Sequence, residues 1–184
     1  MACEPLYERV GALTGGLAPP LRGRSETPAL ERNGDNRLVS EARQQAFINA
    51  PIGVVWELLE DVDRHPEWWP RVLEIECEED FEPGCTYREV VRGPVGKDQM
   101  LLRVDQMEDC KELLIRCVNT GTFVHWLLTE AQEGTFVDAR FGMDPSKIQY
   151  RVFDLVAGKR YFRSWVRQSL DAMQRVARER AARV

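Results

Sequence analysis

Between residues 72 and 143 the sequence contains six consecutive segments with the composition of β-strands. Glycine, proline or short polar residues separate them, and such residues favour turns. Strands joined by connections this short can pair only with antiparallel neighbours, so we predict an antiparallel meander. The predicted strands are 72–79, 86–93, 98–108, 112–120, 122–131 and 135–143.

The segment before the meander predicts one further strand and a helix. Residues 41–50 form the predicted strand, and Pro51 suits the first turn of a helix because it lacks a backbone donor. Pro66 ends this helix, and the sequence PEWWP is too short for more than one further helical turn. The apolar residues at helical spacing are Ile52, Val55, Trp56, Leu59 and Val62.

The sequence after Pro145 returns to a helical period. Apolar residues recur at this spacing from Ile148 to Val156 and again from Phe162 to Val176, with arginines on the opposite side. We predict one long C-terminal helix with a kink at Gly158, since glycine weakens a helix interior by about 1 kcal/mol relative to alanine.

These elements predict an α+β fold in which a seven-stranded antiparallel sheet packs one face against the long C-terminal helix. Because sheets twist and curl, an apolar pocket can remain between the two layers. The run 122–131 is apolar on both faces, so its inward face is not evident from periodicity. The predicted lining residues are Trp69, Tyr87, Met100, Leu102, Ile115, His125, Trp126, Phe162 and Trp165.

The length of 184 residues fits one domain, which we place at residues 41–184. Residues 1–40 are rich in glycine, proline and charge, and we expect a flexible extension. No apolar run is long enough to span a membrane, and the N-terminus does not resemble a signal peptide, so we expect a cytoplasmic protein. The five cysteines include no C-x-x-C pair, which indicates reduced, buried thiols and no metal site.

The sequence HPEWWPR at residues 65–71 places two tryptophans between two prolines. Side chains of adjacent residues point in different directions, so we expect Trp69 to face the cavity or core and Trp68 to be more exposed. The alternative is that both tryptophans pack under the turn as part of the core. For His65, at the end of the first helix, capping as a cation is a more plausible role than catalysis.

Four segments together resemble a known superfamily. They are FINAPIGVVWELLEDVDRHPEWWPRVLEIE, PGCTYREVV, EGTFVDARF and SLDAMQRVARE, and the resemblance extends over residues 41–183. They are similar to the START, polyketide cyclase and birch-pollen-allergen superfamily (SRPBCC). The resemblance implies a helix-grip fold: a curved seven-stranded sheet wraps around the C-terminal helix, two short helices lie between the first two strands, and a deep hydrophobic cavity lies inside.

The same resemblance implies less about activity. Members bind lipids, sterols, polyketides, quinones or plant hormones, and some catalyse aromatic cyclisation or hydrolysis. The superfamily has no shared catalytic motif that can be transferred to this sequence, so we predict no catalytic residue. Fold alone does not decide function.

Two functional hypotheses follow, and both need no cofactor or metal. The first is binding of a small hydrophobic or amphipathic molecule, such as a lipid, polyketide or quinone. The second is a polyketide cyclase or aromatase-like enzyme in which His125 or Arg140 assists proton transfer. The strand residues Arg103, Asp105, Arg116, Asp138 and Arg140 either project inward or form ion pairs on the wet face.

A third hypothesis uses the charge distribution. The C-terminal region is basic, while residues 57–82 are strongly acidic. The basic helix could contact a membrane or protein transiently. It does not predict nucleic-acid binding. Phe162, Trp165 and Val166 share one helical stripe, and the basic residues on the other side are Lys159, Arg163 and Arg167.

Overall fold

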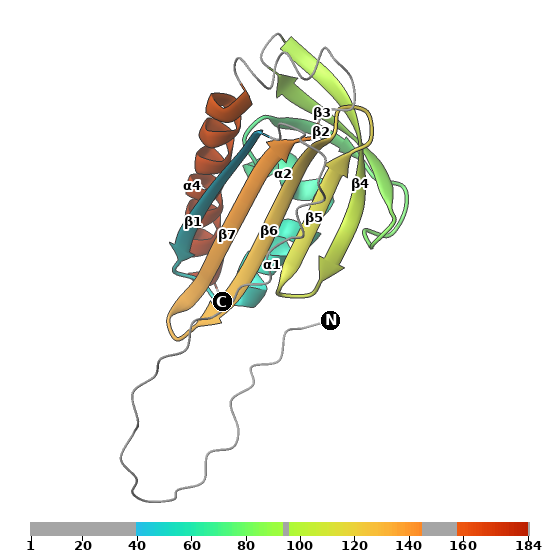
Figure 1. The fold of residues 1–184 in the computed structure, drawn as a ribbon. Helices are drawn as coiled ribbons and strands as arrows, with labels where there is room; N and C mark the ends of the chain where they lie inside the picture. Colours follow the sequence, from blue (N-terminus) through green and yellow to red (C-terminus); the bar gives the residue numbers. More distant parts are fainter. Residues whose placement is uncertain (1–39, 94–95, 145–157, 184) are drawn as a thin grey trace, which may run out of the picture. The chain divides into compact units, whose positions relative to one another are not determined.

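The computed structural model describes residues 40–93, 96–144 and 158–183 (Figure 1). Seven antiparallel strands form one sheet in the order β1-β7-β6-β5-β4-β3-β2, so the first strand pairs with the last. The predicted meander is therefore confirmed. The strands are β1 (Ser40–Ile48), β2 (Val72–Glu76), β3 (Thr86–Gly93), β4 (Gly96–Glu108), β5 (Glu112–Cys117), β6 (Thr122–Ala131) and β7 (Gly134–Met143).

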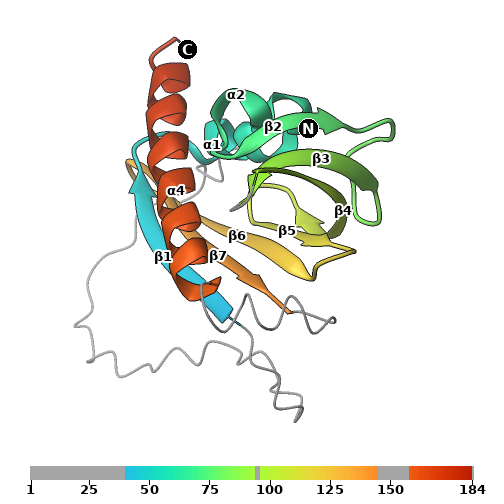
Figure 2. The same ribbon diagram turned by 90° about the horizontal axis from the view of Figure 1, so that it is seen from above.

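Three short helical segments connect β1 to β2, and one long helix follows the sheet. The short segments are α1 (Ile52–Glu60), the 3₁₀ turn η1 (Val62–Arg64) and α2 (His65–Trp68). The long helix is α4 (Lys159–Ala181), with Gly158 as its N-cap residue. Figure 2 shows the sheet curving, with α4 lying along β1 and β7. This is the expected helix-grip arrangement. None of the helices among the described residues is long and apolar enough to cross a membrane.

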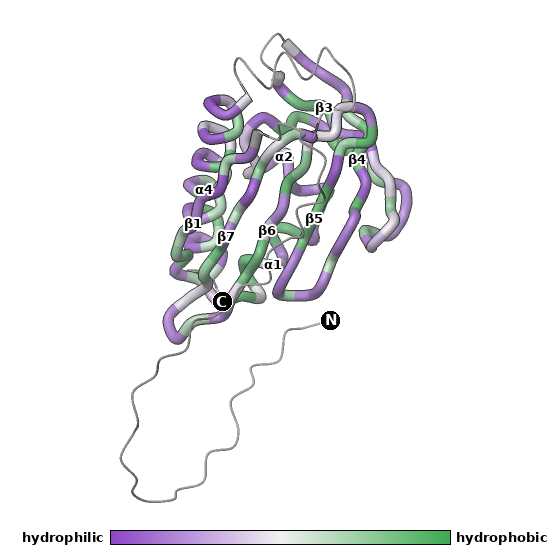
Figure 3. The backbone as a smooth tube through the Cα atoms, viewed as in Figure 1, coloured by the Kyte–Doolittle hydropathy of each residue, from purple (hydrophilic) through white to green (hydrophobic). Residues whose placement is uncertain are grey.

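The face of the sheet toward α4 is apolar, and the other face carries most of the charge. Hydropathy alternates along the strands, as Figure 3 shows for β6 and β7. In β6, Phe123, His125 and Leu127 are partly exposed, whereas the buried residues are Thr122, Val124, Trp126 and Leu128. We call these two surfaces the inner and outer faces of the sheet. The structure thus decides which face of residues 122–131 points inward.

One strand ends earlier than the sequence predicts, and two predicted segments lie outside the described residues. The strand predicted at 112–120 ends at Cys117, because the amide of Gly121 donates to the Cys117 carbonyl at 3.0 Å and closes a turn. Residues 1–39 and 145–157 lie outside the described residues, and so do the predicted extension and the start of the C-terminal helix.

The cysteines only partly follow the expectation of reduced thiols. Cys77, Cys85 and Cys117 are free, and the sulfur atoms of Cys77 and Cys85 lie 3.8 Å apart. Cys110, in contrast, is disulfide-bonded. The expectation is wrong for Cys110, because sequence spacing does not show which cysteines the fold brings together.

Candidate functional site

A cavity of about 260 Å³ lies between the inner face of the sheet and the first turns of α4. We call it the inner pocket. Its volume is just below the roughly 300–1,000 Å³ common for sites that bind drug-sized ligands, so it suits a small molecule. Apolar and aromatic side chains dominate its wall. The lining residues are Arg71, Val91, Gly93, Asp98, Met100, Thr120, Thr122, Met143, Tyr161, Phe162 and Trp165.

The polar part of the pocket wall includes two threonines at the start of β6. Thr120 donates its hydroxyl proton to the Thr122 hydroxyl at 3.0 Å, and the Thr122 amide donates back to the Thr120 hydroxyl at 3.2 Å. Both side chains are buried. Because Thr120 and Thr122 are hydrogen-bonded to each other, this part of the pocket wall is polar and its hydroxyls already have partners.

Arg71 and Tyr161 form a boundary between the inner pocket and a second concavity. Both residues line the inner pocket and also a groove of about 950 Å³ between the turn after α2 and the side of α4. The guanidinium carbon of Arg71 lies 4.3 Å from the Tyr161 ring centre, which is a cation–π contact. Arg71 has a φ of 79°, an uncommon conformation for a non-glycine residue. This strained turn places the arginine against the aromatic ring.

An aromatic cluster fills the interior beside the inner pocket. The Trp69 ring lies 5.7 Å from Trp126 on β6 and 6.4 Å from Trp165 on α4. Phe141 on β7 lies 5.1 Å from Trp126 and 4.9 Å from Trp165. Trp165 also donates its indole proton to the Pro70 carbonyl at 3.2 Å. This cluster packs the α2–β2 turn between the sheet and the helix.

The two adjacent tryptophans are both buried, which corrects the expectation that Trp68 is exposed. Trp68 is 5% exposed and Trp69 is 4% exposed. Their rings stack, with centroids 5.5 Å apart and planes 12° from parallel. Trp68 ends α2, whereas Trp69 has extended dihedral angles. The change of backbone conformation between the two residues lets both rings turn to the same side.

His65 is buried and neutral, so it does not act as a cationic cap. Burial lowers the pKa of His65 to about 4. Its Nε2 lies 3.0 Å from the Leu59 carbonyl, one of the last carbonyls of α1. A neutral imidazole that donates from Nε2 satisfies this helix end. His65 therefore caps α1 through a hydrogen bond and without its charge.

Two polar side chains project from β3 into the interior. Tyr87 is 2% exposed and Glu89 is 4% exposed, and they alternate with the exposed Arg88. Burial raises the pKa of Glu89 to about 8 and raises the pKa of Tyr87 well above its ordinary value. Tyr87 was predicted from the sequence to face the cavity, whereas Glu89 was not. The signal was available, because a two-residue period that places Tyr87 inward also places Glu89 inward.

His125 lies on the outer face of the sheet, opposite to its neighbour Trp126. Its Nε2 is 2.6 Å from the Glu112 carboxylate on β5. The expectation that His125 lines the cavity is therefore wrong, because the buried residues of β6 are the even-numbered ones. Arg140 pairs with His125 across β6 and β7 and lies on the same outer face.

The remaining charged strand residues form ion pairs on the outer face. Asp138 accepts hydrogen bonds from Arg43 at 2.9 Å and from Gln45 at 3.0 Å. Asp105 accepts from Arg103 at 2.7 Å and from Arg116 at 2.8 Å. Partial burial opposes ionisation of both aspartates, but these hydrogen bonds outweigh it and lower the pKa of each carboxyl. These residues therefore form ion pairs on the solvent-exposed face of the sheet and do not project inward.

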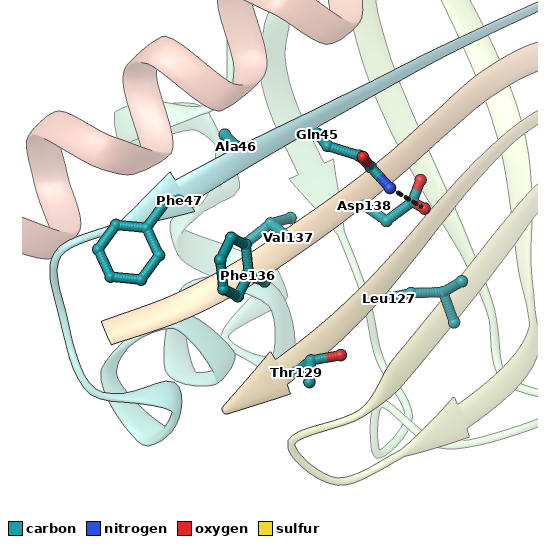
Figure 4. Close-up of a pocket in the computed structure, with 8 residues that line it drawn as sticks. All are labelled: Gln45, Ala46, Phe47, Leu127, Thr129, Phe136, Val137 and Asp138. Carbon is teal, nitrogen blue, oxygen red and sulfur yellow. Dashed lines mark hydrogen bonds between the residues drawn. The ribbon is translucent and has the colours of Figure 1, made fainter. Parts of the chain in front are cut away.

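The outer face also carries a shallow apolar concavity of about 440 Å³ at one end of β1, β6 and β7 (Figure 4). The rings of Phe47 and Phe136 lie side by side there, with centroids 5.1 Å apart, and both are substantially exposed. Gln45 and Asp138 form its polar end, as the dashed line in Figure 4 shows. No contact among the residues that the structure describes indicates what would bind in this concavity.

The structure brings three of the nine predicted lining residues together in the inner pocket, namely Met100, Phe162 and Trp165. It places five others in the buried core on the same side of the sheet: Trp69, Tyr87, Leu102, Ile115 and Trp126. His125 is separated from all of them by the sheet. Sequence reasoning did not identify Arg71 or the threonine pair, since turn residues carry no periodic signal.

Comparison with protein families gives a match over most of the chain. Residues 40–178 match the family described as polyketide cyclase / dehydrase and lipid transport. None of the curated proteins matches the chain significantly.

Several solved structures share the fold. The di-domain aromatase/cyclase StfQ of the steffimycin biosynthetic pathway has a TM-score of 0.64 and 20% identity, over 79% of this chain and 53% of StfQ. The chain thus spans about half the length of that protein. The protein TTHA0849 from Thermus thermophilus has a TM-score of 0.63 and 16% identity, over 77% of this chain and 99% of that protein.

A third solved structure, that of Ara h 8.0201, has a TM-score of 0.58 and 12% identity, over 79% of this chain and 99% of that protein. These identities are low, so the solved structures support the fold alone. The family match covers well over half of the sequence. The chain belongs to the polyketide cyclase / dehydrase and lipid transport family, within the SRPBCC superfamily.

Proposed function

We propose that this protein binds a small hydrophobic or amphipathic molecule, of lipid, polyketide or quinone-like character, in the inner pocket. The observation that carries the proposal is the apolar cavity between the sheet and α4, which Val91, Met100, Met143, Phe162 and Trp165 line. Apolar walls with few polar groups are typical of small-molecule sites. The family description, which names lipid transport, supports the same reading.

The charged groups at the rim favour an amphipathic ligand over a pure hydrocarbon. Arg71 and Asp98 line the same pocket as the apolar residues. A ligand whose apolar body occupies the cavity can therefore leave a polar group near Arg71. The cation–π contact with Tyr161 holds the guanidinium at this position.

A pair of substitutions on one strand tests the proposal. Met100 is buried and lines the pocket, while the next residue, Leu101, is exposed on the opposite face of β4. Met100→Trp should fill part of the cavity and weaken binding of a naphthalene-based probe by about tenfold or more, whereas Leu101→Trp should leave the affinity unchanged. Isothermal titration calorimetry measures both. Equal affinities for the two variants would refute binding in the inner pocket.

A cyclase-like activity is the second candidate, and one observation favours it. Glu89 is a buried carboxyl with a pKa near 8, within the range in which a side chain can transfer protons. His125 and Arg140 do not support this candidate, since both lie on the outer face. The test is deuterium exchange at the methyl group of acetylnaphthalene in heavy water. Exchange that Glu89→Gln does not slow would exclude Glu89 as the catalytic group.

Two further expectations stay predictions. One is a cytoplasmic location. The other is transient contact of the basic C-terminal helix with a membrane or protein, for which α4 presents the exposed Arg163, Arg167 and Arg175.

A further inference from the structure

The inner face of β3 carries two polar groups without partners. Glu89 makes no hydrogen bond or ion pair with any of the described residues, although only 4% of it is exposed. The hydroxyl of Tyr87, two residues earlier on the same face, is also buried without a hydrogen-bond partner in the described part of the chain. Leaving such groups unsatisfied destabilises the folded protein, so their retention in an apolar interior calls for a reason.

Register places Glu89 next to the inner pocket, although neither Glu89 nor Tyr87 is itself part of the pocket lining. Glu89 lies directly opposite Met100 in the β3–β4 pairing, and Met100 lines the pocket. Val91, two residues from Glu89 on the same face, lines it as well. The Glu89 side chain therefore lies beside the apolar wall of the pocket. Tyr87 lies two residues further along β3, on the side of Glu89 away from Val91.

Both groups are hydrogen-bond donors at neutral pH. Burial alone raises the pKa of Glu89 to about 8, so its carboxyl keeps its proton. The pKa of Tyr87 is raised mainly by burial and further by Glu89, Cys77 and Cys85, so the phenol keeps its proton too. Burial is the only cause of this shift, and no positive charge among the described residues stabilises the ionised form of Glu89.

We propose that the Tyr87 hydroxyl and the neutral Glu89 carboxyl form a donor pair that binds a carbonyl oxygen of an apolar ligand. This inference rests on the proposed function of the inner pocket and specifies the ligand class. A tyrosine hydroxyl beside a neutral carboxylic acid is a known arrangement for binding a carbonyl oxygen that gains negative charge. Two donors and an apolar wall suit a ketone or quinone better than a hydrocarbon.

The test compares three probes that share one two-ring skeleton: acetylnaphthalene, ethylnaphthalene and naphthylethylamine. Affinities are measured at about pH 6, where Glu89 is neutral. The double variant Tyr87→Phe with Glu89→Leu removes both donors and keeps similar shapes. It should lower the affinity for acetylnaphthalene relative to ethylnaphthalene by at least about tenfold. Arg88→Gln, on the outer face of the same strand, is the matched control and should change neither affinity.

Infrared spectroscopy of bound acetylnaphthalene gives an independent readout. Hydrogen bonding lowers the carbonyl stretching frequency, so the frequency in the wild-type complex should lie below that of acetylnaphthalene in an apolar solvent such as hexane. Glu89→Gln retains a donor and should preserve most of this shift. The double variant should abolish it, and a role of the two residues in packing alone would leave the frequency unaltered.

The outcomes separate this inference from the proposed function. If neither acetylnaphthalene nor ethylnaphthalene binds the wild-type protein, the proposed function fails and the donor pair fails with it. If both probes bind and the double variant leaves the ratio of their affinities unchanged, ligand binding in the inner pocket is supported and the donor pair is refuted. Tighter binding of naphthylethylamine that Glu89→Gln abolishes would show that Glu89 binds a cation instead, which also overturns the inference.

Discussion

The indole nitrogen of Trp69 donates a hydrogen bond of 3.0 Å to the hydroxyl of Ser169, which lies 100 residues later in the chain. Ser169 in turn donates to the Trp165 carbonyl at 2.9 Å. Through this pair the turn after α2 is attached to α4, whose first turns form one wall of the inner pocket. The tryptophan thereby links the sheet, the turn and the helix around one site.

Ser169→Ala should lower the free energy of unfolding by about 1–3 kcal/mol, because the buried Trp69 indole loses its acceptor. Urea denaturation measures the change. Gln168→Ala alters an exposed neighbour on the same helix and should change stability by less than about 0.5 kcal/mol. Equal effects of the two substitutions would mean that the hydrogen bond contributes nothing measurable.

Glu89 should make the protein less stable as the pH rises. Its pKa is about 8 in the folded protein and about 4.5 in the unfolded chain. Between these values the unfolded chain has lost the proton that the folded protein keeps. Stability should therefore fall through this window by up to about 1.4 kcal/mol per pH unit. Glu89→Gln should remove this slope in urea denaturation at several pH values, and an unchanged slope would contradict the buried, neutral carboxyl.

His65 should make the protein less stable as the pH falls. Its pKa is about 4 in the folded protein, below the ordinary 6.5, because burial disfavours the imidazolium. As the pH falls from 6.5 to 4, the unfolded chain binds a proton that the folded protein excludes, so stability is lost. Between pH 4.5 and 6.5 the effect of His65 offsets the effect of Glu89, so His65→Gln should make stability fall with rising pH in this range and leave the fall between pH 6.5 and 8 unchanged. Loss of the fall between pH 6.5 and 8 in His65→Gln would indicate a general disruption of the fold.

Gly121 occupies a position that no other residue fits, and Gly53 supplies the control. Gly121 has a φ of 72°, and a Cβ atom there would lie 2.0 Å from the Asp144 carbonyl oxygen. Gly121→Ala should therefore destabilise the protein by more than about 2 kcal/mol. A Cβ at Gly53, within α1, meets no atom within 4 Å. Gly53→Ala should stabilise the protein by about 0.4–1 kcal/mol. Thermal unfolding of both variants checks the contrast.

His125→Ala should leave the affinity for a naphthalene probe unchanged, because the sheet separates His125 from the inner pocket. The substitution should lower only the free energy of unfolding, by about 1 kcal/mol, because the contact with Glu112 is lost. Calorimetric titration and urea denaturation measure the two effects. A large loss of affinity at unchanged stability would make His125 a ligand contact after all.

The strands, their antiparallel order and α1 could be predicted from the sequence because each has a local pattern. The alternation of Leu73, Ile75 and Cys77 with glutamates identifies β2, and the stripe from Ile52 to Leu59 identifies α1. Family resemblance then supplied the wrapping of the sheet around the C-terminal helix, which the structure confirms.

The candidate site was predicted less well. Met100, Phe162 and Trp165 line the inner pocket, since each lies on the apolar face of its element, and their contact with a ligand stays a prediction. The partners of the outer-face charges could not be predicted, because ion pairing across strands depends on register. Asp138, for example, meets Arg43 only because β1 pairs with β7.

The sequence by itself determined which segments are strands or helices. The spacing of apolar residues shows which side of a segment is buried, and this spacing differs between a strand and a helix. Only the tertiary structure decided which face of β6 is inward, why Trp68 and Trp69 stack, and that Glu89 is buried without a partner. These outcomes depend on contacts between distant segments, such as Trp69 with Ser169. Side-chain burial, and with it the protonation of Glu89, follows from how the layers close on each other, which no local pattern records.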